Sequence, residues 1–299
     1  MLDITLFDSN FPHQKYLTPY LNSNKINWIR DGVRRKFNVY TDNFIKATSV
    51  RSDSVDIPND GNISICLLLE PYTNPPWTDI YDYIRTDHEK FDLVITHNIQ
   101  LLGDLISNMP EKFIYSSKCI TTTWLEKEFI GLHKKKGMIS MPFSFKNYSE
   151  GHRIRHVIYE KYKNSGLIDF YGSGQEKNIS DFRFSLKDYR YSICCENTLQ
   201  NGFNSEKLND CFLTGTIPIY WGSTNIRYPY KQDAMFFFTP KNKDKVDFNF
   251  DESLELLDKQ IKYILENEPY NKLINSVEYN YYYTLDHLQS ENNLFDIIK

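Results

Sequence analysis

The chain has 299 residues and a formal net charge of −4, with 25% charged and 40% hydrophobic residues. This composition is typical of a globular protein with one large or two medium domains, and a charge so close to zero argues against a dedicated nucleic-acid binder. No apolar run reaches the roughly 20 residues that a membrane helix requires, so we expect no transmembrane segment.

The first half of the chain alternates buried strands with helices. Residues 4–7 fit a strand, residues 14–21 and 42–47 fit short helices, and residues 53–62 fit a loop. The apolar runs 63–69 and 91–96 are typical of parallel strands buried on both faces. Helices are predicted over 77–85 and 101–109, and a strand over 113–115. This alternation predicts an α/β domain with a parallel sheet.

Glu70 directly follows the predicted 63–69 strand. The prolines at 71, 75 and 76 favour an extended loop after it. Open α/β sheets place ligand-binding groups at the carboxyl ends of their strands, so Glu70 is a candidate catalytic residue. The other interpretation is a surface glutamate beside a turn.

The basic run at residues 134–137 is predicted to be an exposed linker between two domains. We therefore divide the chain into residues 1–136, residues 137–285 and a C-terminal segment, 286–299, that packs back on the first domain. The alternative is a basic surface turn within one domain.

The second half repeats the strand–helix alternation. Strands are predicted over 138–141 and 167–171, a helix over 150–163, and further helices over 251–266 and 275–298. The second strand ends at Gly172, in a Gly-Ser-Gly sequence that predicts a loop close to a ligand, although one such sequence is a weak signal.

Residues 190–222 form the most informative stretch. A predicted strand, 191–195, is followed by Glu196 and Asn197, and Ser205 caps a predicted helix with Glu206 and Lys207 in its first turn. The unpaired amides and the dipole at a helix N-terminus favour an anion, whereas a lysine there is unfavourable unless an anion meets it. Two interpretations follow: a phosphate site, or a solvated lysine on an ordinary helix.

The order of these residues resembles the signature of the family 10 glycosyltransferases, the α-1,3/1,4-fucosyltransferases. The matching segments are Glu-Asn at 196–197, Phe-Asn-Ser-Glu-Lys at 203–207 and Gly-Thr-Ile-Pro-Ile-Tyr-Trp-Gly at 215–222. The chain departs from the family at Ser205, where threonine is usual, and at Phe203, where tyrosine is common. The resemblance implies a GT-B-like fold of two Rossmann-like domains with a central cleft.

The resemblance also implies roles for single residues. Glu70 is the general base that takes the proton from the acceptor hydroxyl, although the asparagine usual between Glu and Pro is missing here. Lys207 and Arg155, with Arg153 as the second candidate, stabilise the diphosphate. Glu206 binds a pair of hydroxyls on the ribose or the sugar. Further donor-binding candidates are Asn197, Phe203 and Gly172, whereas Glu196 is expected to hold the loop.

The implied reaction is an inverting transfer of L-fucose from GDP-β-L-fucose to a hydroxyl of an oligosaccharide acceptor, giving an α-1,3-type linkage. We expect no cofactor and no metal, because the chain lacks a D-x-D carboxylate pair and the four-apart pair His152 and His156 has no third ligand in view. Two alternatives stay open: another GDP- or UDP-linked sugar donor, or a glycan-binding module without catalysis.

The expected location is the cytoplasm of a bacterium or of a virus-infected host cell. Asp3, Asp8 and His13 interrupt any apolar run that would form a secretory signal. The five cysteines are odd in number and form no C-x-x-C pair, which favours a reducing compartment.

Overall fold

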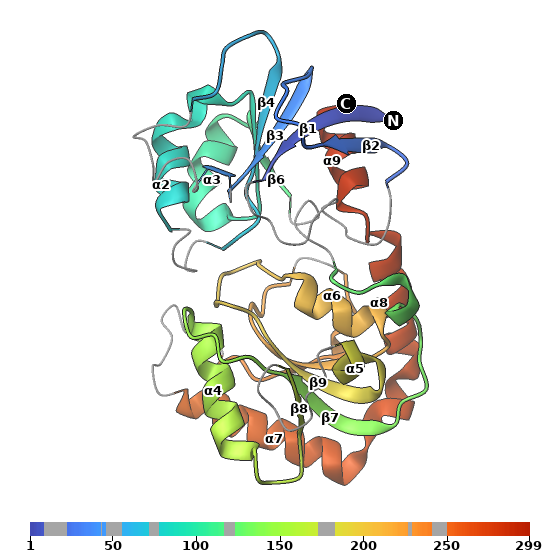
Figure 1. Ribbon diagram of the computed structural model, residues 1–299. Coiled ribbons are helices and arrows are strands. Elements are labelled where there is room, and N and C mark those ends of the chain that lie inside the picture. The colour runs from blue at the N-terminus through green and yellow to red at the C-terminus, as the bar shows by residue number, and fades with distance from the viewer. Residues whose placement is uncertain are drawn as a thin grey trace. The chain divides into compact units, whose positions relative to one another are not determined.

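A computed structural model describes residues 1–8, 23–42, 44–45, 56–71, 78–116, 123–172, 183–226, 229–240 and 250–299 (Figure 1). The chain divides into two compact units. Unit 1 comprises residues 1–124 together with 287–299, and unit 2 comprises 125–286. The predicted helix at 14–21 lies outside the described residues; of the one at 42–47, residues 42, 44 and 45 are helical, and residues 43, 46 and 47 lie outside the described residues.

Unit 1 contains a six-stranded sheet in the order β2-β1-β3-β4-β5-β6, in which every adjacent pair is parallel. This is the parallel sheet that the alternating pattern predicts. Its strands are β1 (Leu2–Phe7), β2 (Ile26–Ile29), β3 (Phe37–Thr41), β4 (Ile63–Leu67), β5 (Leu93–Thr96) and β6 (Phe113–Tyr115).

The helices of unit 1 bury the apolar faces of this sheet. Helices α2 (Thr78–Asp87) and α3 (Ile99–Asn108) pack with β4 and β5 in one core, and the short helix η1 (His88–Lys90) follows α2 (Figure 1). Helix α9 (Ser290–Ile298) lies beside β2, where Trp28 Nε1 donates to Glu291 Oε1 over 3.3 Å. The C-terminal segment is thus part of unit 1 although it is last in the sequence.

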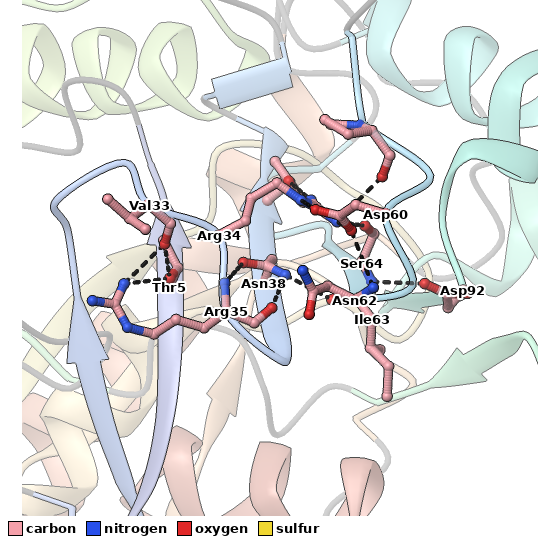
Figure 2. Close-up of polar contacts among 12 residues, drawn as sticks. Thr5, Val33, Arg34, Arg35, Asn38, Asp60, Asn62, Ile63, Ser64 and Asp92 are labelled. Carbon is pink, nitrogen blue, oxygen red and sulfur yellow. Dashed lines mark hydrogen bonds and ion pairs between the residues drawn. The ribbon is translucent and has the colours of Figure 1, made fainter.

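A polar network joins the middle of β1 to the amino ends of β3 and β4 (Figure 2). Arg34 donates to Asp60 from Nε over 2.8 Å and from Nη2 over 2.9 Å, while Arg35 Nη1 donates to Thr5 Oγ1 over 3.0 Å. Asn38 Oδ1 accepts from the backbone N–H of Arg35, and its Nδ2 donates to the carbonyl of Ile63. These bonds join neighbouring strands at the edge of the sheet opposite their carboxyl ends, which leaves the carboxyl edge for a site.

Unit 2 contains a five-stranded sheet in the order β11-β10-β9-β7-β8, with every adjacent pair parallel. Its first strand in sequence lies between two later strands, so the direction of the chain connections reverses between β7 and β9. Such a switch point is where open α/β sheets bind ligands. The strands are β7 (Gly137–Pro142), β8 (Asp169–Tyr171), β9 (Tyr189–Cys195), β10 (Ile217–Trp221) and β11 (Phe236–Phe237).

Helices cover both faces of this sheet (Figure 1). Helices α4 (Glu150–Tyr162) and α7 (Asp251–Asn267) share an apolar core with β7, β9 and β10. Helices α5 (Arg183–Lys187), α6 (Glu206–Leu213) and α8 (Ile274–Asp286) lie on the other side. Short helices are η2 (Lys127–Phe129), η3 (Gln232–Ala234) and η4 (Pro269–Leu273). Among the described residues, no helix has the length and apolarity to cross a membrane.

Two predicted boundaries differ from the structure. The units divide at residues 124–125 and not at 136–137, because Lys135 is built into unit 2: its Nζ donates to the Thr214 carbonyl over 2.6 Å and to Thr216 Oγ1 over 2.8 Å. The basic run at residues 134–137 therefore lies within unit 2, in agreement with the alternative of a turn within one domain. The predicted helix 275–298 is instead two helices, because α8 belongs to unit 2 and α9 to unit 1.

Candidate functional site

The carboxyl end of β9 is the centre of the candidate site. Helix α4 reaches it closely, since the N–H of Gly151 donates to the carbonyl of Asn197 over 3.0 Å. A Cβ atom at Gly151 would lie 1.7 Å from the carbonyl oxygen of Glu196, so only glycine permits this approach. The N-termini of α4 and α6 therefore both lie near the end of β9.

Glu196 ties the end of β9 to the start of α6, as the sequence predicts. Its buried carboxylate accepts from the Ser205 N–H over 2.8 Å, from Ser205 Oγ over 2.7 Å and from Tyr220 OH over 3.2 Å. Burial raises the pKa of Glu196. With three donors and a nearby lysine, the carboxylate acts as a structural brace for the loop between β9 and α6.

Lys207 provides a positive charge at the N-terminus of α6. Ser205 caps this helix by accepting from the N–H of Lys207, whose Nζ donates to Glu206 Oε1 over 2.8 Å and lies 4.0 Å from Glu196 Oε2. Burial opposes the charge of Lys207, but Glu206 and Glu196 outweigh it and raise the pKa to about 12. The sequence predicts that a lysine in the first turn of this helix is unfavourable unless an anion meets it. In the structure, the carboxylates of Glu206 and Glu196 provide that negative charge.

Arg155 joins α4 to the same strand end. Its Nη2 donates to the carbonyl of Cys195 and, over 3.1 Å, to Asn197 Oδ1. The structure therefore brings together Arg155, Asn197, Glu206 and Lys207, whereas Arg153 is on an exposed part of α4. Of the two arginine candidates, Arg155 is the one that contacts the end of β9.

The other two predicted donor residues are Phe203, which is buried, and Gly172, which makes a close backbone contact. Phe203 is 4% exposed, within the loop between Asn197 and Ser205. Gly172 has a φ of +142°, and a Cβ there would lie 1.9 Å from the carbonyl oxygen of Phe143. This close backbone contact between the end of β8 and the end of β7 by itself requires glycine at 172, without any contact to a ligand.

His152 is a residue of the site that the sequence singled out only as a possible metal ligand. Its ring Nδ1 lies 2.6 Å from Ser149 Oγ in the first turn of α4, and burial together with the charge of Arg155 lowers its pKa to about 4. His156 instead contacts the Lys146 carbonyl over 3.0 Å. Among the described residues, no group of three or more His, Cys, Asp or Glu side chains is placed to hold a metal ion.

Glu70 lies at the carboxyl edge of the sheet in unit 1, and neighbouring side chains form hydrogen bonds with its backbone. Asp42 Oδ2 accepts from the N–H of Leu69 over 2.8 Å and from that of Glu70 over 2.7 Å. Tyr81 OH donates to the Glu70 carbonyl over 2.8 Å and lies 3.4 Å from Nε2 of the buried His97.

Sequence reasoning missed the role of Asp42, which it assigned to a short helix. Sequence reasoning did not predict the strand 37–41, which Asp42 directly follows, and strands that end at one edge of a sheet bring such side chains together. Recognising the contact with Glu70 requires the knowledge that β3 pairs with β4.

Known proteins resemble this chain over part or most of its length. No protein-family model matches the chain. The alpha-(1,3)-fucosyltransferase FucT of Helicobacter pylori is 37% identical over 83 residues, which are 27% of this chain and 15% of that protein. The match thus spans only a small part of this curated relative.

Solved structures extend the likeness to most of the chain. The crystal structure of an alpha1,3-fucosyltransferase with GDP-fucose has a TM-score of 0.52 at 13% identity, covering 91% of this chain and 81% of that one. A second alpha1,3-fucosyltransferase structure scores 0.51 at 15% identity, covering 94% and 80%. The GtfA/B complex scores 0.50 at 11% identity, covering 88% and 57%. At such identities the likeness shows the fold alone. The chain therefore has the α/β fold with parallel sheets of the GT-B glycosyltransferases, as predicted.

Proposed function

We propose that this chain is an inverting glycosyltransferase. It transfers L-fucose from GDP-β-L-fucose to a hydroxyl of a glycan acceptor and forms an α-1,3-type linkage. The observation that carries the proposal is the meeting of Lys207, Arg155 and Asn197 at the carboxyl end of β9, between two helix N-termini. The local similarity to the Helicobacter pylori fucosyltransferase supports the choice of donor.

The proposed donor site suits a diphosphate. The N-termini of α4 and α6 both lie near the end of β9, and both helix dipoles favour negative charge there. Arg155 and Lys207 add two positive charges. Lys207 is paired with Glu206, so a phosphate bound there would share the lysine and leave the Glu206 carboxylate to accept from donor hydroxyls.

The proposed chemistry is a single displacement. The Glu70 carboxylate takes the proton of the acceptor hydroxyl while that oxygen forms a bond to the anomeric carbon of fucose. The bond from this carbon to the phosphate oxygen breaks, and GDP departs with the electron pair. Attack from the opposite side converts the β-linked donor into an α-linked product. The bonds from Asp42 and Tyr81 to the backbone of Glu70 would limit the movement of the base.

We further propose that the transfer needs no divalent ion or cofactor. Arg155 and Lys207 would neutralise the charge that develops on the departing diphosphate, a task that a metal ion performs in other glycosyltransferases. The test is the rate of transfer after treatment with EDTA, which should equal the untreated rate. A rate that disappears with EDTA and returns with Mg²⁺ or Mn²⁺ would reject this part.

A cytoplasmic location completes the proposal. Cys66, Cys194, Cys195 and Cys211 are buried free thiols, as expected in a reducing compartment. Expression with a periplasmic export signal tests this, since export should lower the yield of active protein relative to cytoplasmic expression.

The decisive experiment is product analysis after incubation with GDP-fucose and a glycan array. We expect a product heavier by one fucose, with the linkage position and α configuration read by NMR. The Glu70→Gln variant should bind GDP like the wild type and lose turnover. Stabilisation by UDP-sugars but not by GDP would overturn the choice of donor. Glycan binding without affinity for any nucleotide would instead identify a non-catalytic binding module.

A further inference from the structure

His152 occupies a defined position in the first turn of α4. Its ring Nδ1 lies 2.6 Å from Ser149 Oγ, and His152 as a whole is only 6% exposed. Ser149 is the N-cap of this helix, and its Oγ accepts from the backbone N–H of His152 over 3.4 Å. The hydroxyl of Ser149 can accept from this N–H and still donate its own proton, and its donation to Nδ1 would leave the ring proton on Nε2. Within the described part of the chain, no atom is hydrogen-bonded to Nε2.

Four basic residues lower the pKa of His152 through their charge. Arg155 and His156 come from α4, Lys146 from the loop before it, and Lys207 from α6. The ring of Tyr148 contacts the imidazole edge-on, with 5.2 Å between the ring centroids. A neutral donor beside positive charges, with no acceptor among the residues that the structure describes, is complementary to an anion.

We propose that His152 is a binding residue for the nucleotide diphosphate, donating from Nε2 to a phosphate oxygen beside Arg155 and Lys207. This inference rests on the proposed function, because it takes the same donor site. Ser149 orients the imidazole, and burial together with the charges of the basic neighbours lowers its pKa. A bound diphosphate opposes those charges, so the imidazole becomes easier to protonate when GDP is present.

The first test is the titration of the His152 ring by NMR, with and without saturating GDP. A histidine far from the bound diphosphate would titrate at the same pH in both samples. We expect His152 to titrate near pH 4 in the free protein and at least about one pH unit higher with GDP, while the signal of His156 moves less.

The second test is calorimetry of GDP binding to matched variants. His152→Phe keeps a ring but removes the donor and should weaken GDP binding about tenfold, as expected for one lost hydrogen bond to a charged group. His152→Gln retains an N–H donor near the Nε2 position and should recover part of that affinity. His156→Gln, one turn further along α4, is the control and should bind within about twofold of the wild type.

The outcomes separate this inference from the proposed function. If the wild type binds GDP, but His152→Phe binds it equally well or the His152 titration does not respond to GDP, the inference is wrong and the donor site stands. If His152→Phe does not fold, the titration of the wild type decides alone. A wild type that binds no GDP would overturn both the proposed function and this inference.

Discussion

Arg155 and Asn197 are in direct contact: the guanidinium Nη2 of Arg155 donates to Asn197 Oδ1 over 3.1 Å. The same Nη2 donates to the carbonyl of Cys195, so one side chain of α4 holds both the last residue of β9 and the turn that follows. This contact orients the asparagine and places a permanent positive charge between the two helix N-termini.

Arg155→Lys should weaken GDP binding by about tenfold or more, because an ammonium does not reproduce the planar arrangement of guanidinium donors. The measurement is the dissociation constant for GDP by calorimetry. Arg153→Lys is the matched control on the exposed part of α4 and should change affinity by less than about twofold. A larger loss in the Arg153 variant than in the Arg155 variant would reverse the assignment of the phosphate-binding arginine.

Asp42→Ala should lower kcat by roughly 100-fold with little change in the affinity for GDP. The alanine leaves the N–H groups of Leu69 and Glu70 without their carboxylate, so the proposed base loses its fixed position. Steady-state kinetics with GDP-fucose, beside GDP calorimetry, measure both quantities. Tyr81→Phe removes one bond to the Glu70 carbonyl and should cost less. Unchanged kcat in a folded Asp42→Ala protein would contradict the positioning role.

Glu196→Gln should destabilise the fold by about 1–3 kcal/mol, because the amide cannot accept on both sides as the carboxylate does. Ser205 donates to Glu196 from its N–H and from its hydroxyl, so the start of α6 loses a brace. Urea unfolding measures the change in free energy. Glu255→Gln on the exposed part of α7 is the control and should lie within about 0.5 kcal/mol of the wild type. Equal stability of the two variants would show that the brace contributes nothing.

Gly151→Ala and Gly103→Ala should have opposite effects, although both glycines lie in helices. A Cβ at 151 would lie 1.7 Å from the Glu196 carbonyl oxygen, so α4 must move away from the end of β9 and both stability and GDP affinity should fall. A Cβ at 103 has its nearest neighbour at 3.6 Å, so alanine there should raise stability by up to about 1 kcal/mol. Thermal unfolding of the two variants tests this. A Gly151→Ala protein as stable as the wild type would disprove the close approach of α4.

The stability of the protein should fall as the pH is lowered from about 6.5 towards 4. Burial lowers the pKa of His97 from 6.5 to about 4, so the folded state disfavours the proton that the unfolded state binds. Its contribution is fully present above pH 6.5 and is lost as the pH falls through the folded-state pKa, amounting to roughly 3 kcal/mol.

Carboxylates titrate in the same range, so the comparison is between the wild type and His97→Gln. Urea unfolding at several pH values should give a shallower pH dependence for the variant, because the glutamine does not titrate. Parallel curves for the two proteins would show that His97 is not the group responsible.

Local patterns were enough to predict much of the second unit. The apolar run, the polar pair at its end, the capping serine and the helix with one apolar face predict β9, α6 and β10 in their observed order, and they place Lys207 in the first turn of α6. Period and capping depend on residues a few positions apart, so they can be read along the chain. The predicted alternation of strands and helices likewise yields two parallel sheets.

The sequence patterns do not predict which strands and helices become neighbours. The pairing of β3 with β4 lets Asp42 accept from the backbone N–H of Glu70. The approach of α4 to β9 joins Arg155 to Asn197. It also brings His152 near Lys207. The same packing builds Lys135 into unit 2 and moves the boundary between the units. These contacts join residues far apart in sequence, and their energies come from packing and desolvation that exist only once the chain has folded.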